Sequence, residues 1–196
     1  MSKTKISIIG CGNIGSAMAM GFIKSKKYLP NEINLTKRKS ESLKKLKQQG
    51  FKTSNNNKKV IKKSNIIILS VGPNHLIELL KDISPILNDN HIIISVVSGI
   101  EIKDIQKIIG TKIPLIRAMP NTAASSCESL TCLSSSTHFQ KELKLVESIF
   151  NTIGKTIVID EEKMSSATAL GACGVAFFLR AIRAASQGGI EIGFHS

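Results

Sequence analysis

"KISIIGCGNIGSAM", residues 5–18, passes from a short β-branched run through a glycine-rich turn into a helical pattern. Gly10, Gly12 and Gly15 have the spacing G-x-G-x-x-G: the first glycine permits the tight bend, the second lets a pyrophosphate approach the backbone, and the third lets helix and strand pack closely. The helix that follows offers free N–H groups and a partial positive charge to that phosphate. A glycine turn without a ligand is the alternative. We predict a dinucleotide-binding strand, turn and helix, with the pyrophosphate at Gly10, Cys11, Gly12, Asn13, Ile14 and Gly15.

Outward from this turn, apolar runs alternate with helical patterns over the first 160 residues. Runs such as residues 66–69 are apolar without interruption, as strands buried on both faces of a parallel sheet require. Alternation of strands and helices implies right-handed crossovers. The sequence therefore predicts an α/β fold: a Rossmann-like, doubly wound, mainly parallel sheet. The expected strands are 5–10, 32–38, 65–71, 91–97, 113–119, 130–135 and 155–160, and the expected helices are 13–26, 40–49, 57–63, 74–87, 101–109 and 138–152.

The pattern changes at Glu161, where one long helical period begins and no further strand follows. This helix is apolar around much of its circumference, and the preceding domain offers no partner large enough to cover it. We expect one domain over residues 1–160 and the opening of a second, helical domain over residues 161–196. Its helix is expected to pair with a second copy of the chain.

The chain has a net charge of +13, and a strong positive charge is typical of proteins that bind nucleic acids. However, the lysines are spread along the chain, and there is one Tyr and no Trp to stack on bases, so we expect no nucleic-acid partner. The four cysteines show neither a C-x-x-C pair nor metal-ligand spacing, which predicts reduced thiols and no metal site. No apolar run approaches the ~20 residues of a membrane span, and the N-terminus lacks a secretory layout. A cytoplasmic protein without a membrane partner is expected.

The end of the second expected strand decides which coenzyme is bound. An acidic residue there would accept the ribose hydroxyls of NAD, but residues 35–40 read LTKRKS. Arg38 can bind a 2′-phosphate through paired N–H donors, and Lys37 can bind it as a point charge. The sequence favours NADP(H) over NAD(H); the alternative is that both bases belong to the general lysine excess.

Ligands of open α/β sheets bind beyond the carboxyl ends of the strands, so the segments that follow the strands are candidates to contact the coenzyme. One of these segments is RAMPNTAAS, residues 117–125, where Pro120 gives a rigid turn and Asn121 an amide that can bond a nicotinamide. A Pro-Asn turn that only closes a strand is the alternative. The other candidates are Ser70, Val71, Gly72, Pro73, Val96, Val97 and Ser98.

Several stretches resemble the pyrroline-5-carboxylate reductase family in their order and spacing: GCGNIGSAM, SVGPNHL, ISVVSGI, LIRAMPNTAA, and ATALGACGVAF followed by GGIEIGF. The resemblance covers the whole chain. It implies an NAD(P)-binding domain followed by a helical dimerisation domain, a homodimer or higher oligomer, and reduction of 1-pyrroline-5-carboxylate to L-proline with NAD(P)H in proline biosynthesis. It also implies that Asn57 contacts the nucleotide and that Glu161 and Thr168 lie near the substrate pocket.

The chain departs from this family at several positions. Gly72 replaces the lysine of the family's A-V-K-P loop, and residues 168–176 read TALGACGVA where the family usually has T-A-L-S-G-S-G-P-A. The family's P-G-G-T-T loop, which holds the substrate carboxylate, is expected downstream of residue 196. Two alternatives stay open: a catalytically silent NADP-binding protein, and a reductase of a related imine or keto acid. No general acid is assigned, because His75 and His138 are expected at the surface.

Overall fold

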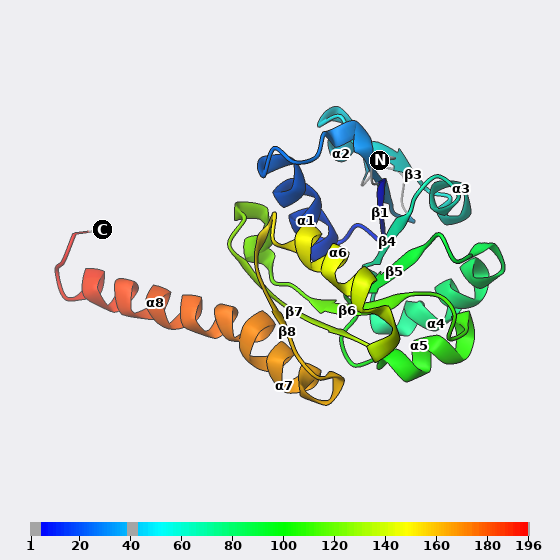
Figure 1. The fold of residues 1–196 in the computed structure, drawn as a ribbon. Helices are drawn as coiled ribbons and strands as arrows, with labels where there is room; N and C mark the ends of the chain where they lie inside the picture. The colour runs from blue at the N-terminus through cyan, green and yellow to red at the C-terminus, as the bar shows by residue number, and fades with distance from the viewer. Residues whose placement is uncertain (1–4, 39–42, 196) are drawn as a thin grey trace.

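The computed structural model describes residues 5–38 and 43–195 and forms one eight-stranded sheet in the order β3-β2-β1-β4-β5-β6-β7-β8 (Figure 1). β1 to β6 are parallel, β7 is antiparallel to β6, and β8 is parallel to β7. The chain builds outward from β1 in both directions, so the predicted doubly wound, mainly parallel sheet is confirmed. The strands are β1 (Ile6–Ile9), β2 (Ile33–Thr36), β3 (Lys52–Ser54), β4 (Ile66–Leu69), β5 (Ile92–Ser95), β6 (Leu115–Met119), β7 (Ser129–Ser135) and β8 (Gly154–Val158).

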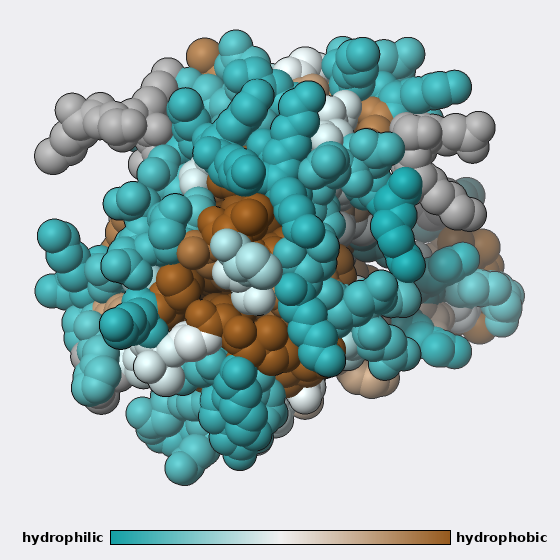
Figure 2. Space-filling model, turned by 90° about the vertical axis from the view of Figure 1, so that its right-hand side faces the viewer, coloured by the Kyte–Doolittle hydropathy of each residue, from teal (hydrophilic) through white to brown (hydrophobic). Residues whose placement is uncertain are grey.

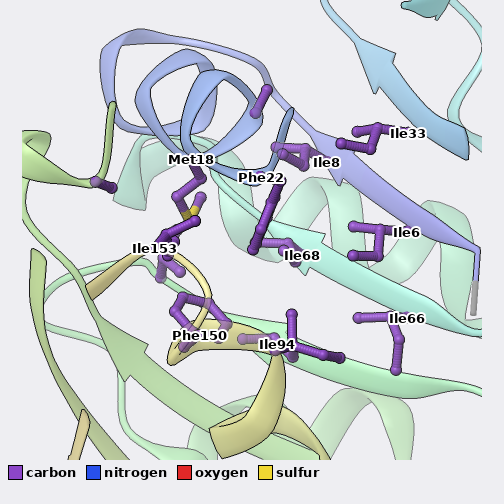
Figure 3. Close-up of a cluster of buried hydrophobic side chains, with 14 of the residues drawn as sticks. Ile6, Ile8, Met18, Phe22, Ile33, Ile66, Ile68, Ile94, Phe150 and Ile153 are labelled. Carbon is purple, nitrogen blue, oxygen red and sulfur yellow. The ribbon is translucent and has the colours of Figure 1, made fainter. Parts of the chain in front are cut away.

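Helices cover both faces of the sheet. Phe22 and Phe150, from α1 and α6, pack against β1, β4 and β5 on one face (Figure 3). α3, α4 and α5 cover the other face through a second apolar cluster. Neighbouring residues of one strand serve both clusters, as Ile66 and Ile67 do, which explains why these strands are apolar without interruption. The helices are α1 (Asn13–Lys24), α2 (Lys44–Gln48), α3 (Asn57–Ile61), α4 (Pro73–Ile83), α5 (Ile102–Ile109) and α6 (Gln140–Phe150), with 3-10 turns η1 (Pro30–Glu32), η3 (Ser84–Ile86), η4 (Thr122–Ser126), η5 (Thr137–Phe139) and η6 (Glu161–Lys163).

Two details of the predicted elements are wrong. The edge strand β3 was not expected, because three polar residues carry no apolar alternation; its pairing with β2 makes it a strand. The helix expected over 74–87 ends as α4 at Ile83 and continues as a 3-10 turn that contains Pro85. Of the helix expected over 40–49, residues 40–42 lie outside the described residues, and α2 accounts for the remainder.

The small residues of RAMPNTAAS are explained by the packing of α1 on η4. Ala124 is fully buried, and its carbonyl oxygen lies so close to Gly21 that a Cβ at Gly21 would collide with it. The second collision partner would be Ile153, with 2.9 Å between that Cβ and the Ile153 Cγ2 atom. A larger side chain at Gly21 or at Ala124 would push α1 away from the loop that follows β6.

The chain beyond β8 leaves the body of the molecule. α7 (Met164–Ala167), a π-helix (η7, Thr168–Cys173) and α8 (Gly174–Glu191) form a rod that begins against the sheet, where Met164 is fully buried, and projects away from it along α8 (Figure 1). The predicted single helix is therefore interrupted by a π-helical segment. Large apolar side chains along the rod are exposed, among them Leu170, Phe177, Phe178, Leu179 and Ile182, each more than 60% accessible.

By length and composition alone, the stretch Glu161–Glu191 could cross a membrane. Core helices of soluble proteins meet the same criterion, and the expectation that no uninterrupted apolar run approaches a membrane span is not contradicted. Arg180 and Arg183 interrupt the apolar sequence of α8, so the stretch meets the criterion through the mean hydropathy of a window within it and not through a continuous apolar run.

The lysine excess is solvated. Figure 2 shows the side of the molecule where α3 and α4 lie, and hydrophilic side chains cover most of it around one apolar strip. Lysines of α3 and α5 that form ion pairs do so with carboxylates at the surface, as Lys58 does with Asp82 and Lys107 with Asp104. Such exposed ion pairs contribute little to the free energy of unfolding.

Candidate functional site

The glycine turn follows β1 at the centre of the sheet, where the strand order reverses. Gly10 has a φ of +83°, and its N–H and that of Cys11 donate to the carbonyl oxygen of Thr36, at 3.2 and 2.8 Å. A Cβ at Gly10 would meet the side chain of Val71 and lie 2.9 Å from the carbonyl oxygen of Ser70. A Cβ at Gly15 would lie 3.0 Å from the Ser70 hydroxyl and 3.2 Å from Ile8. The first and third glycines are thus required by packing within the protein.

Gly12 is different, because a Cβ there would have no neighbour closer than 3.9 Å. Gly12 is also the N-cap of α1, where no side chain caps the helix and no acidic residue lies in the first turn. The first N–H groups of α1 have no intrahelical partner, and they carry the partial positive charge of the helix dipole. The hydroxyl of Ser70 is buried without a hydrogen-bond partner in the described part of the chain. These features fit a pyrophosphate on the turn.

Cys11 lies in this turn but does not face the solvent. Its side chain is fully buried, and its thiol lies 3.4 Å from the Ser16 hydroxyl. Burial raises the pKa of the Cys11 thiol, while the Ser16 hydrogen bond and the charge of Lys37 act in the opposite direction. Cys11 is therefore a neutral, packed residue at neutral pH.

Lys37 and Arg38 follow β2, next to the glycine turn. Lys39 and Ser40 of the same basic stretch lie outside the described residues. The Arg38 guanidinium donates from Nη2 to Nε2 of His75 at 2.9 Å, and both side chains are exposed. The sequence had suggested a surface position for His75, which is correct, but not its contact with Arg38.

The remaining cofactor candidates lie at the same edge of the sheet. Residues 70–73 follow β4, residues 96–98 follow β5, and Pro120 and Asn121 follow β6. Parallel strands bring these segments together, as the sequence predicted. Asn57 is the first residue of α3, after β3, and the cap of that helix is the side chain of Asn56.

Asn121 is bound within the protein. Its side-chain oxygen accepts from the Ala123 N–H at 3.1 Å, and its amide nitrogen donates to the Gly171 carbonyl at 3.0 Å. Its backbone N–H donates to the Ser129 hydroxyl at 3.2 Å. Asn121 therefore joins the loop after β6 to the π-helix η7, and only one amide hydrogen is left for a ligand.

Glu161, expected on the substrate side, forms an ion pair with a buried arginine, while its own side chain is 27% exposed. Its Oε1 accepts from Nη1 of Arg117 at 2.6 Å and from the Ile102 N–H, at the N-terminus of α5, at 3.0 Å. Arg117 is 2% exposed, and neither its Nε nor the Glu161 Oε2 has a partner among the described residues. The other expected substrate-side residue, Thr168, donates its hydroxyl to the Met164 carbonyl at 2.7 Å.

The sequence analysis did not assign two residues that contact candidate site residues: Arg117, which contacts Glu161, and His75, which contacts Arg38. A single arginine inside the apolar run 113–119 was the available signal for Arg117, because an arginine in a central strand needs a buried partner. For His75 the local pattern offers no signal, since its partner lies 37 residues away.

Comparison with known proteins gives several consistent findings. Residues 5–99 match the family model described as NADP oxidoreductase coenzyme F420-dependent. The chain is 44% identical over 203 residues to pyrroline-5-carboxylate reductase 1 of Dictyostelium discoideum, which covers 97% of this chain and 37% of that protein. It is 41% identical over 211 residues to pyrroline-5-carboxylate reductase 2 of the same organism, covering 100% of this chain and 71% of that protein.

The fold is also that of a solved reductase. The crystal structure of Plasmodium falciparum pyrroline carboxylate reductase with NADP bound has a TM-score of 0.90 to this chain at 24% identity, covering 100% of this chain and 72% of the other. The chain thus spans little more than a third of the first relative and about 70% of the other two. Sequence identity over this length, together with the glycine turn and the doubly wound sheet, establishes the relationship. The chain belongs to the pyrroline-5-carboxylate reductase family of oxidoreductases.

Proposed function

We propose that this protein reduces 1-pyrroline-5-carboxylate to L-proline with NADP(H), used in preference to NAD(H), in proline biosynthesis. The observation that carries the proposal is the open first turn of α1 at Gly12, in a chain 41% identical to a pyrroline-5-carboxylate reductase over its whole length. The bases Lys37 and Arg38, with no acidic residue beside them, support the preference for a 2′-phosphate.

The residues of the chain would act mainly by positioning. The backbone at Gly10 to Gly15 would hold the pyrophosphate, and residues 70–73 would line the same crevice. The loops after β5 and β6 would flank the nicotinamide. When bound, the reduced coenzyme supplies a hydride, and the protein's task is to hold the electrophilic C=N carbon of the substrate close to it.

Glu161 and Thr168 each form hydrogen bonds within the protein, so only their remaining polar atoms would be available to the substrate. For Glu161 this is Oε2, since Oε1 is bound to Arg117 and to the Ile102 N–H. For Thr168 it is the acceptor side of the hydroxyl, since its hydrogen is donated to Met164. No side chain of the described residues is assigned as a general acid.

The domain boundary near residue 160 and the assembly of the protein belong to the same proposal. We assign residues 1–160 to the coenzyme-binding domain and residues 161–196 to the start of a helical dimerisation domain. The exposed apolar side chains of α8 support a homodimer or a higher homo-oligomer. A cytoplasmic location is also proposed, in line with four free cysteines, which are typical of a reducing compartment.

The test is coenzyme oxidation in the presence of 1-pyrroline-5-carboxylate, measured side by side on the 196-residue chain and on the product of the complete gene. NADPH binding to each is measured by calorimetry. Gly12→Ala should keep the fold, because 3.9 Å is ordinary contact distance for the new methyl, yet weaken NADPH binding about tenfold or more by blocking the pyrophosphate. Gly188→Ala, in open space on α8, is the matched control with unchanged binding.

The outcomes separate the alternatives. Binding of NADPH without turnover by the complete gene product would instead favour a catalytically silent nucleotide-binding protein, for which Gly72 and the altered residues 171–175 are the supporting observations. Turnover with another cyclic imine or keto acid, but not with 1-pyrroline-5-carboxylate, would favour a reductase of different substrate range. Absence of binding to either coenzyme would overturn the proposal.

A further inference from the structure

Arg38 and His75 come from opposite sides of β1. Arg38 follows β2, whereas His75 lies in the first turn of α4, which follows β4. β2 and β4 are the two neighbours of β1 in the sheet. The 2.9 Å contact between the Arg38 guanidinium and the His75 imidazole therefore bridges the sheet edge across the carboxyl end of β1, where the glycine turn lies.

Several features place the His75 ring at this bridge. Gly72 is the N-cap of α4, Pro73 starts the helix, and the His75 N–H donates to the Gly72 carbonyl at 2.9 Å. A Cβ built on Gly72 would lie 3.9 Å from Cδ2 of His75, so the ring lies beside the position of the missing side chain.

The direction of the hydrogen bond is determined by the chemistry of the two groups. A guanidinium has only donors, so Nε2 of His75 accepts and the neutral ring carries its proton on Nδ1. The contact uses one of the five N–H donors of Arg38 and leaves the others for a ligand. An exposed arginine loses side-chain entropy when it binds, and a residue that holds it in place beforehand reduces that cost.

We propose that His75 is a positioning residue for the 2′-phosphate of the coenzyme: it accepts a hydrogen bond from Arg38, holds the guanidinium at the edge of the crevice, and thereby increases the preference for NADP(H) over NAD(H). The inference rests on the proposed function, because it concerns the same crevice. It adds a residue on α4 to a specificity that the sequence had assigned to the end of β2 alone.

The experiment isolates the phosphate by comparing calorimetric binding of 2′,5′-ADP and 5′-ADP to the 196-residue protein. His75→Ala should lower the preference for 2′,5′-ADP by about three- to tenfold, the range of the net contribution of one ordinary hydrogen bond, while binding of 5′-ADP stays unchanged. His75→Gln, whose side-chain oxygen can accept from Arg38, should restore most of the preference. Asn74→Ala, an exposed change in the same turn of α4, is the matched control and should bind like the unmodified protein.

A double-mutant cycle tests whether His75 acts through Arg38. Arg38→Ala should abolish most of the preference, and Arg38→Ala/His75→Ala should then cause no further loss. An unchanged preference in His75→Ala overturns the inference, and so does a further loss in the double variant, which would mean direct contact of the imidazole with the phosphate. If the unmodified protein binds neither nucleotide, the proposed function itself fails. All variants are compared by circular dichroism to verify that they fold.

Discussion

The backbone of Gly10 has a φ of +83°, a conformation that a side chain makes costly, and its surroundings add a second penalty. A Cβ at this position would meet Val71 and Ser70 of the neighbouring strand end. Gly110, at the end of α5, also has a positive φ, +85° with ψ 165°, in a region essentially restricted to glycine, but a Cβ there would have no neighbour within 4 Å. A side chain at Gly110 would therefore meet mainly a conformational cost, whereas a side chain at Gly10 would also collide with its neighbours.

We predict that Gly110→Ala lowers the free energy of unfolding by about 1–3 kcal/mol, the cost of placing a side chain in this positive-φ region. Gly10→Ala should lower it by about 2 kcal/mol more, because the methyl group also overpacks the turn. Urea unfolding of both variants measures the difference. An equal decrease in the free energy of unfolding in the two variants would show that residues 70 and 71, after β4, move to accommodate the methyl group.

His91 is a titratable residue whose protonation should affect folding. It is 5% exposed before β5, and its Nδ1 accepts from the Asn88 N–H at 3.0 Å. Burial lowers the pKa of His91, while a hydrogen bond with the Ile61 backbone acts in the opposite direction. The folded protein therefore prefers the neutral imidazole more strongly than the unfolded chain does.

This preference has a defined sign. Because the folded pKa lies below the unfolded value of about 6.5, His91 contributes stability above that pH, and this contribution is lost as the pH falls through the folded pKa. We predict that the free energy of unfolding falls more steeply between pH 7 and pH 5 in the unmodified protein than in His91→Gln. Urea titrations at several pH values test this, and parallel pH profiles of the two proteins would contradict it.

At the scale of elements, Arg117 and Glu161 connect parts of the chain that are 44 residues apart. Arg117 lies in the centre of β6, Glu161 begins the segment that leads into α7, and Glu161 also bonds the N-terminus of α5. A buried charge without its partner is costly, whereas an apolar pair of similar volume is often tolerated. The pair therefore joins the start of the projecting rod to the sheet, together with the buried Met164 and the Asn121 bond to Gly171.

We predict that Arg117→Leu lowers the free energy of unfolding by about 2 kcal/mol, because it leaves the partly buried Glu161 carboxylate without a cation. Arg117→Leu/Glu161→Leu should lose less than the sum of the two single variants. Denaturant unfolding of all three provides the coupling energy. Additive losses would mean that the two side chains stabilise the protein independently, contrary to their 2.6 Å contact.

For the whole molecule, the decisive feature is the exposed rod. Phe178 and Ile182 are spaced one turn apart on α8 and are 73% and 65% exposed. Arg180, Gln187 and Glu191 form a polar stripe on the opposite side of the helix. A soluble monomer with such a surface would expose a large apolar patch to water.

We predict that the protein self-associates through this apolar surface. Phe178→Glu/Ile182→Glu should raise the dissociation constant of the dimer by about tenfold or more, whereas Gln187→Glu on the polar stripe should leave it unchanged. Analytical ultracentrifugation measures both. A monodisperse monomer, or a chain that binds vesicles without pairing, would show that the rod has a different partner.

The sequence alone determined the order of strands and helices, the doubly wound sheet and the glycine turn. These follow from local rules: hydrophobic periodicity assigns each segment, and a positive φ requires Gly10. Tertiary structure decided the edge strand β3, the contact of Arg38 with His75, and the ion pair of Arg117 with Glu161. It also bound the Asn121 side chain to Gly171, which left the amide less free than the sequence suggested. Each of these depends on atoms distant in the chain that only folding brings within bonding distance, and no local pattern encodes such a partner.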